Sequence, residues 1–215
     1  MAARSNNRFP WWGWLIVAAG FILPPILITR WMEPEPADRT LIAAILDDAK
    51  APVIGPADAD IVIVIFTDYR CPVCRRTEAA IAALMASDPK VRLMVKDWAI
   101  LGDASVRGAE AALAARYQGR YAALHEAMMQ SSGPLDDAAL AAIARDAGLD
   151  TVRLFADRKA HADAIAAQRD RIAREAFALK LAGTPGVIVG PFLVPGGLDV
   201  GRLRKLVAEA RAGAR

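Results

Sequence analysis

Cysteine and histidine are scarce in this chain of 215 residues, which contains two of each. His125 and His161 lie far in sequence from Cys71 and Cys74, so the chain alone does not supply a four-ligand zinc site. We therefore expect no bound metal and no cofactor. The net charge is only +3, and no basic stripe is interleaved with aromatic residues. This composition argues against a nucleic-acid partner.

Hydrophobic residues are abundant, at 55% of the chain, and the segment from Trp11 to Ile28 carries no charge. At about 1.5 Å per residue, a helix here is long enough to cross the roughly 30 Å hydrocarbon layer of a membrane. We predict a cytoplasmic N-terminus at 1–8 and a transmembrane anchor at 9–31, with the remainder of the chain exported. A cleaved signal peptide is the alternative, although no small-x-small cleavage sequence follows the segment.

Residues 32–50 are predicted to form a linker that ends in a short amphipathic helix. Prolines and glutamates alternate at 33–36, which indicates a stiff and extended spacer. Apolar residues then recur on one face of a helix over 39–50. That face either docks on the main domain or pairs with a second copy of the chain, so an oligomer through 39–50 remains possible.

The main domain is predicted to span 51–215 and to belong to the α/β class. Two apolar runs flanking a helix give a β-α-β unit, and a helical insert of about 103–181 follows. A β-hairpin and a closing helix complete the order. The expected elements are strands at 53–55, 61–66, 91–96, 186–190 and 192–194, and helices at 75–87, 105–118, 120–130, 136–147, 151–159, 161–180 and 199–212.

The two cysteines form a Cys-x-x-Cys motif, Cys71-Pro72-Val73-Cys74, directly after the apolar run and at the start of a helix. This arrangement is typical of a redox-active thiol pair. A structural disulfide is a weak alternative, because a loop this short removes little chain entropy. Binding of a soft metal such as Cu(I) by the two thiolates is a second alternative.

The position of Cys71 favours its thiolate. The N-terminus of a helix stabilises an anion, and Pro72 suits the first helical position. Arg70, with Arg75 and Arg76, adds positive potential nearby. Cys74 lies one turn inside the helix, so we expect it to be less exposed and to act as the resolving thiol.

A second motif, Gly183-Thr184-Pro185-Gly186, precedes the predicted hairpin. Sequence spacing leaves it open whether this is an ordinary turn or a cis-proline loop, because few X-Pro bonds are cis.

Together these motifs resemble the DsbA-like thiol–disulfide oxidoreductases, in particular those of the ScsC and Com1 type. The matching segments run in family order and cover the exported domain: 51–55, 66–74, 96–102, 183–185 and 194–196. The resemblance implies a thioredoxin fold with a helical insertion between its βαβ and ββα motifs, preceded here by one transmembrane helix. It also implies that Cys71 attacks and Cys74 resolves, that Pro185 is cis and packs beside the cysteine pair, and that Thr184 faces the substrate.

The resemblance further implies a single-pass protein of the bacterial inner membrane with its catalytic domain in the periplasm. Its substrates would be exported proteins that contain cysteine, and a DsbB-like or DsbD-like membrane protein would restore its redox state. An oxidase is the favoured activity. The alternatives are a reductase or isomerase of the same fold, or a non-catalytic module that acts as a chaperone or binds Cu(I).

One position departs from the family pattern. Relatives usually carry a glutamate six residues before the first cysteine, where this chain has Ile65. We expect Asp68 to hydrogen-bond within its loop, His125 to be structural, and Lys96-Asp97 to form a solvated strand end.

Overall fold

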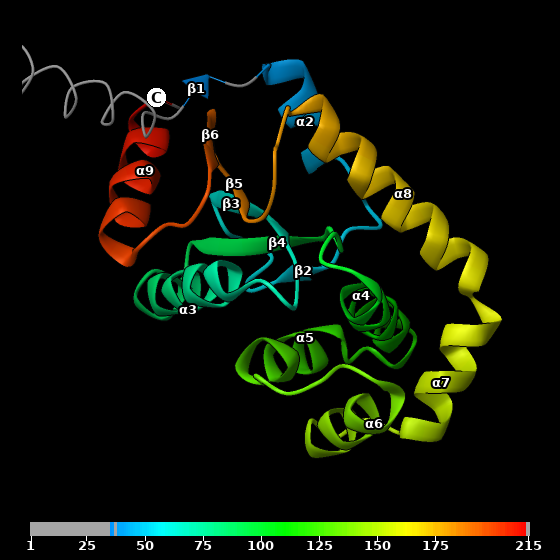
Figure 1. Ribbon diagram of the computed structural model, residues 1–215. Helices are drawn as coiled ribbons and strands as arrows, with labels where there is room; N and C mark the ends of the chain where they lie inside the picture. The colour runs from blue at the N-terminus through cyan, green and yellow to red at the C-terminus, as the bar shows by residue number, and fades with distance from the viewer. Residues whose placement is uncertain (1–34, 37, 214–215) are drawn as a thin grey trace, which may run out of the picture. The chain divides into compact units, whose positions relative to one another are not determined.

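The structure is a computed structural model that describes residues 35–36 and 38–213. Its strands are β1 (Glu35–Pro36), β2 (Val53–Ile54), β3 (Ile61–Thr67), β4 (Val91–Asp97), β5 (Gly186–Val189) and β6 (Phe192–Pro195). They form one six-stranded sheet in the order β1-β6-β5-β3-β4-β2 (Figure 1). The predicted anchor at 9–31 lies outside the described residues. Among the residues described, no helix has the length and apolar character needed to cross a membrane.

Strand β3 is the centre of the sheet, and it pairs in parallel with β4 and antiparallel with β5. Its side chains alternate between two hydrophobic layers, as a strand covered on both faces requires. Ile63 and Ile65 enter one layer, whereas Val64 and Phe66 enter the other. The prediction of a buried central strand is therefore confirmed.

Helices cover both faces of the sheet. Helix α3 (Pro72–Ser87) and helix α9 (Val200–Gly213) pack on the face that carries Ile63 and Ile65. Helix α2 (Arg39–Leu46) and helix α8 (Ala162–Ala178) contribute to the layer on the opposite face. The order β3-α3-β4, helical insert, β5-β6-α9 matches the predicted order of elements.

The insert between β4 and β5 is built around an alanine-rich helix. This helix, α4 (Asp103–Ala115), buries its alanines and contacts the neighbouring helices of the insert. The other elements are a 3-10 turn (Arg116–Gln118), α5 (Tyr121–Gln130), α6 (Asp137–Asp146), α7 (Thr151–Ala160) and α8. Asp136 caps α6 by accepting from the Ala139 N–H at 2.9 Å, and Gly148 follows with φ of 77°, both at their predicted places.

Helix α2 docks on the domain through its apolar face. Ile42 is 6% exposed and Ile45 is fully buried, and both join the layer that contains Phe66 and Ile172. Of the two alternatives for this face, the structure shows docking within the chain. The side chains that would pair with a second copy are largely covered.

The end of β4 corrects one prediction. Lys96 and Asp97 are buried, at 0% and 1% exposure, instead of solvated. Lys96 Nζ lies 2.9 Å from an Asp48 carboxylate oxygen and 2.8 Å from a Glu175 carboxylate oxygen. The carboxylates that neutralise Lys96 come from the segment after α2 and from α8, which lie far from Lys96 in sequence.

Candidate active site

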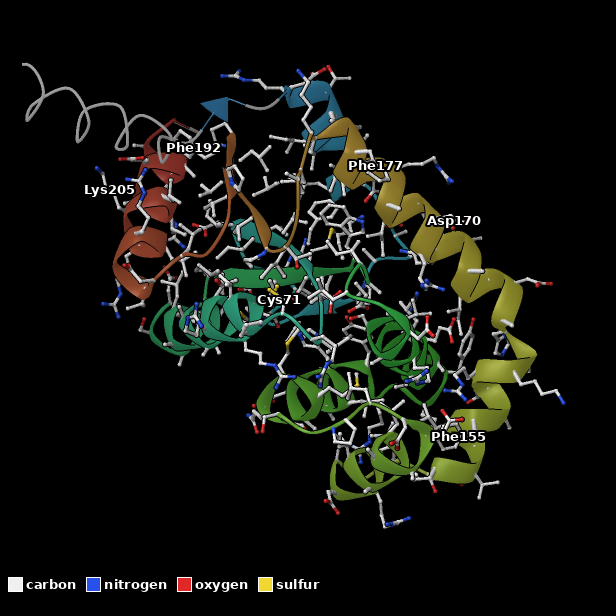
Figure 2. All side chains as sticks on the ribbon, viewed as in Figure 1. Cys71, Phe155, Asp170, Phe177, Phe192 and Lys205 are labelled. Carbon is white, nitrogen blue, oxygen red and sulfur yellow. The ribbon has the colours of Figure 1, made fainter. Side chains whose placement is uncertain are left out.

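Cys71 occupies the N-cap position of α3, which begins at Pro72. Its sulfur accepts a hydrogen bond from the Cys74 backbone N–H at 3.3 Å. Pro72 has no N–H to satisfy, so the first turn directs its free amides and its positive dipole end toward Cys71. The local sequence thus places the first thiol where a negative charge is stabilised. Figure 2 labels Cys71 near the middle of the molecule, where α3 begins.

Cys74 lies one turn further along α3, and its side chain is fully buried, whereas Cys71 is 5% exposed. Both thiols are free. Burial, followed by the hydrogen bond with Cys71, raises the pKa of Cys74 to about 12. Cys74 therefore keeps its proton near neutral pH. The two thiols differ in exposure as the sequence predicted.

The Thr184–Pro185 loop forms the facing half of the site. The Cys71 thiol donates to the Thr184 carbonyl oxygen at 3.5 Å, across 113 positions of sequence. The Thr184–Pro185 peptide bond is cis, as the resemblance implied. Pro185 is buried and its carbonyl accepts the Gly196 N–H at 2.8 Å, which ties the loop to the end of β6. The two sequence motifs thus meet in space.

The loop after β6 packs against the first turn of α3. A Cβ atom added to Gly197 would lie 2.7 Å from Val73 Cγ1. The next residue, Leu198, donates its N–H to Thr77 Oγ1 at 3.2 Å. Only glycine fits at 197 without displacing Val73. Val73 is therefore half-buried under this loop, whereas Pro72 is exposed.

The three arginines near the cysteines have different surroundings. Arg70 is exposed and donates to the Gly133 carbonyl at 2.8 Å, whereas Arg76 is exposed. Arg75 is partly buried and donates to the Tyr69 carbonyl at 2.6 Å. Burial and Arg70 lower the pKa of Arg75, and the two cysteines act in the opposite sense.

Asp68 fixes the loop that leads into Cys71. Its buried carboxylate accepts from the Arg70 N–H at 2.8 Å and from the Ser105 hydroxyl at 2.6 Å. The N–H groups of Ile100 and Leu101 donate to its other oxygen at 2.8 and 3.0 Å. The expected role of Asp68, hydrogen bonding within its loop, is confirmed and extends to the segment after β4.

A buried polar network that the sequence did not predict lies between α3 and α5. Glu78, one turn after Cys74, accepts from the Thr67 hydroxyl at 2.5 Å and contacts His125 Nε2 at 2.6 Å. Burial opposes a charge on His125, but Glu78, Asp97 and Glu126 together outweigh burial and raise the pKa of His125. The expected structural role of His125 thus becomes a specific one, as the partner of a buried carboxylate.

The network continues to the end of β4. Tyr69 Oη lies 2.8 Å from His125 Nδ1 and donates to Asp97 at 2.8 Å. Tyr121 donates to the second Asp97 oxygen, also at 2.8 Å. Burial raises the pKa of Asp97. One sequence signal for this network was available. Glu78 follows Cys74 by four positions, which places both residues on the same, inward face of α3.

A cleft of about 470 Å³ opens beside the network, between α3 and α5. Arg75, Glu78 and His125 supply polar groups, whereas Met85 and Met129 are among its apolar lining. In the described part of the chain, no group of three or more His, Cys, Asp or Glu side chains is placed to hold a metal ion.

Comparison with known proteins relates this site to a family. A thioredoxin family model matches residues 47–209. A thioredoxin-like oxidoreductase from Silicibacter pomeroyi DSS-3 is 40% identical, with a TM-score of 0.75, over 82% of this chain and 99% of that one. None of the curated proteins matches the sequence.

Two further structures are similar. The thiol-disulfide exchange protein alpha-DsbA2 from Wolbachia pipientis is 29% identical, with a TM-score of 0.73, over 79% of this chain and 94% of that one. The catalytic domain of Proteus mirabilis ScsC is 26% identical, with a TM-score of 0.73, over 82% of this chain and 99% of that one. The chain therefore belongs to the thioredoxin family and, within it, to the DsbA-like group that its motifs resemble.

Proposed function

We propose that this chain is a membrane-anchored protein-disulfide oxidoreductase that exchanges its Cys71–Cys74 disulfide with exported proteins, most readily as an oxidase. The observation that carries the proposal is the asymmetry of the thiol pair. The Cys71 sulfur accepts a backbone N–H at the start of α3, whereas burial raises the pKa of Cys74 to about 12. The Cys71 sulfur suits attack by a substrate thiolate and later departure as a thiolate. Cys74 suits a state in which it is protonated and shielded from solvent.

The exchange proceeds in two steps. A substrate thiolate attacks the Cys71 sulfur, the Cys71–Cys74 bond breaks, and Cys74 leaves with the electron pair and takes up a proton. A second substrate thiolate then attacks the substrate sulfur of the mixed disulfide. The substrate disulfide forms, and Cys71 departs as a thiolate. Two electrons have passed to the enzyme, and a DsbB-like membrane partner then oxidises the pair again.

The substrate contacts are proposed at the loop that faces Cys71. Thr184 is partly exposed and precedes the buried Pro185. An extended substrate segment would pair with the backbone beside Thr184, in the manner of an added β-strand. Pro72 and Val73 would border the same opening, and Arg70 would lie at its edge.

The proposed location is the periplasm, with the anchor at 9–31 in the inner membrane. The uncharged run from Trp11 to Ile28 supports this proposal, because its length suits a membrane span. Alkaline extraction of membranes tests it. The full chain should stay in the membrane fraction, whereas a variant that begins at residue 32 should be released. Release of both proteins would refute the anchor.

Oxidation of a peptide that contains two cysteines tests the activity. Cys71→Ala should abolish turnover, whereas Cys74→Ala should trap a mixed disulfide at Cys71. Absence of exchange in the unsubstituted protein would refute the enzyme. Equilibration with glutathione then gives the reduction potential. A potential well below that of the periplasm would refute the oxidase and favour a reductase or isomerase.

A further inference from the structure

Three arginines lie within five positions of Cys71, but only Arg75 is both partly buried and bonded to the backbone that leads into Cys71. Arg70 reaches away to the insert, where it contacts the Gly133 carbonyl. Arg76 is exposed on the outer side of α3. Arg75 is partly buried and lies one helical turn after Cys71.

Two carbonyl groups fix the Arg75 guanidinium at the start of α3. Nη2 donates to the Tyr69 carbonyl at 2.6 Å, two residues before Cys71, and Nη1 donates to the Met129 carbonyl at 3.3 Å. Side chains on a helix lean toward its N-terminus, and residues four apart are neighbours with roughly 5–6 Å between their Cβ atoms. The Arg75 guanidinium is therefore fixed beside the backbone that leads into Cys71, close enough for both cysteines to act on its pKa.

The charge of Arg75 is not paired directly with a carboxylate in the described part of the chain. Among the described residues, Arg75 forms hydrogen bonds to carbonyls and no ion pair. The acidic groups that line the same cleft are Glu78 and Glu126. Glu78 is already bonded to Thr67 and His125, and Glu126 is exposed on α5.

A fixed positive charge affects the two redox states of the pair unequally. The disulfide carries no charge, whereas the reduced state can place a negative charge on the Cys71 sulfur. An uncancelled guanidinium one turn away stabilises that thiolate and does nothing comparable for the disulfide. The reduced state is thereby favoured, and the disulfide becomes a stronger oxidant.

We propose that Arg75, positioned by the Tyr69 and Met129 carbonyls, is the residue that tunes the oxidising strength of the Cys71–Cys74 pair. This inference deepens the proposed function and rests on it. Because the Met129 carbonyl belongs to the last turn of α5, the helical insert takes part in setting the redox property of the thioredoxin motif. The carbonyl end of α5 receives a cation there, which also suits the helix.

The test compares Arg75→Met with Arg76→Met in the full-length protein in detergent. We expect Arg75→Met to shift the equilibrium constant with glutathione about tenfold toward the disulfide, or about 30 mV in reduction potential. The control variant, Arg76→Met, should change it less than twofold. Arg75→Lys keeps the positive charge but loses the planar guanidinium that bonds both carbonyls. Its equilibrium constant should therefore lie between those of Arg75→Met and the unsubstituted protein, even if both variants are equally destabilised.

A second measurement separates this inference from the proposed function. In a Cys74→Ala background, only Cys71 can be alkylated, because the chain has two cysteines. Arg75→Met should move the pH profile of Cys71 alkylation to higher pH, whether or not the protein oxidises substrates. If the unsubstituted protein never exchanges disulfides, the proposed function fails. If Arg75→Met leaves both the alkylation profile and the glutathione equilibrium unchanged, or if Arg76→Met moves them as far, the inference about Arg75 fails.

Discussion

Replacing Lys96 by methionine should destabilise the protein strongly, because it leaves buried carboxylates without their cation. The Lys96 side chain is fully buried, and its two partners Asp48 and Glu175 are 1% and 13% exposed. Removal of one partner of a buried ion pair costs about 3–5 kcal/mol. Asp48 keeps a contact with Arg171 at 2.8 Å and a hydrogen bond from Gln168 at 3.2 Å. We therefore expect a loss near the low end, about 3 kcal/mol.

Urea denaturation of the purified protein measures this loss, and thermal unfolding should show it as a decrease of roughly 6–12 °C in Tm. Lys90→Met is the matched control. Lys90 contacts Asp58 at 2.6 Å, but the two side chains are 52% and 74% exposed. The unfolding free energy of this control should be nearly unchanged, because exposed ion pairs contribute little.

A second substitution tests the physical cause of the loss. If the loss comes from the buried Asp48 carboxylate that has lost Lys96, adding Asp48→Asn to Lys96→Met should restore part of the stability. The Lys96 and Asp48 side chains also predict a pH effect. Burial raises the pKa of Asp48, but Lys96 and the hydrogen bonds from Lys50 and Gln168 together lower it, so this stabilisation is complete above about pH 4 and is lost as pH falls through the lower folded value. A loss equal to that of Lys90→Met, or no recovery in the double variant, would refute the reasoning.

Three further predictions concern the surroundings of the thiols. Asp68→Ala removes a buried carboxylate that accepts four hydrogen bonds, so urea denaturation should show a loss of about 3 kcal/mol; a loss below 1 kcal/mol would contradict this. Gly197→Ala should cost about 1–3 kcal/mol because its Cβ meets Val73, and Val73→Ala should relieve that cost in a double-mutant cycle; simple additivity would exclude the contact. The pKa of His125 is raised in the folded state, so its stabilisation is complete below about pH 6.5 and is lost as pH rises through the higher folded value. The difference in unfolding free energy between the unsubstituted protein and His125→Gln should therefore shrink with rising pH, and a constant difference would argue against the Glu78 pairing.

The fold was predictable from sequence because its signals are local. An apolar run as continuous as 61–66 fits a strand covered on both faces, and β3 spans Ile61–Thr67 in the structure. The cap at Asp136 and the glycine at 148 bounded α6 correctly. The two motifs of the site were also recognisable, because each is a short segment with its own chemistry. Their contact followed only from the family resemblance.

The buried charges were not predictable, because each partner lies on a different element. Glu78 and His125 are 47 positions apart, and Tyr69 and Asp97 are 28 apart. Successive residues of a strand point to opposite faces, so Lys96 and Asp97 enter different layers of the protein. Two adjacent charged residues at the end of a strand normally indicate that the strand end is exposed to solvent. Only the coverage of both faces by helices shows that each charge needs a buried partner.

The choice among the arginines has a similar explanation. Arg70, Arg75 and Arg76 are equivalent in a sequence-based argument from charge. In the structure, Arg75 is partly buried and donates to the Tyr69 carbonyl, two residues before Cys71, whereas its neighbour Arg76 is exposed. Helical geometry could have favoured Arg75, but its two carbonyl partners could not have been anticipated.

The surroundings of the second thiol bear on the direction of electron flow. Ile65 is fully buried, and the nearby carboxylates of Glu78 and Asp97 are each occupied by two hydrogen-bond partners. Burial is the largest cause that raises the pKa of Cys74, and it does not depend on the redox state of Cys71, so little of this thiol is ionised at neutral pH. Its attack on a mixed disulfide at Cys71 should therefore be slow. A slow return would give a second substrate thiol time to complete the substrate disulfide, which supports the oxidase proposed above.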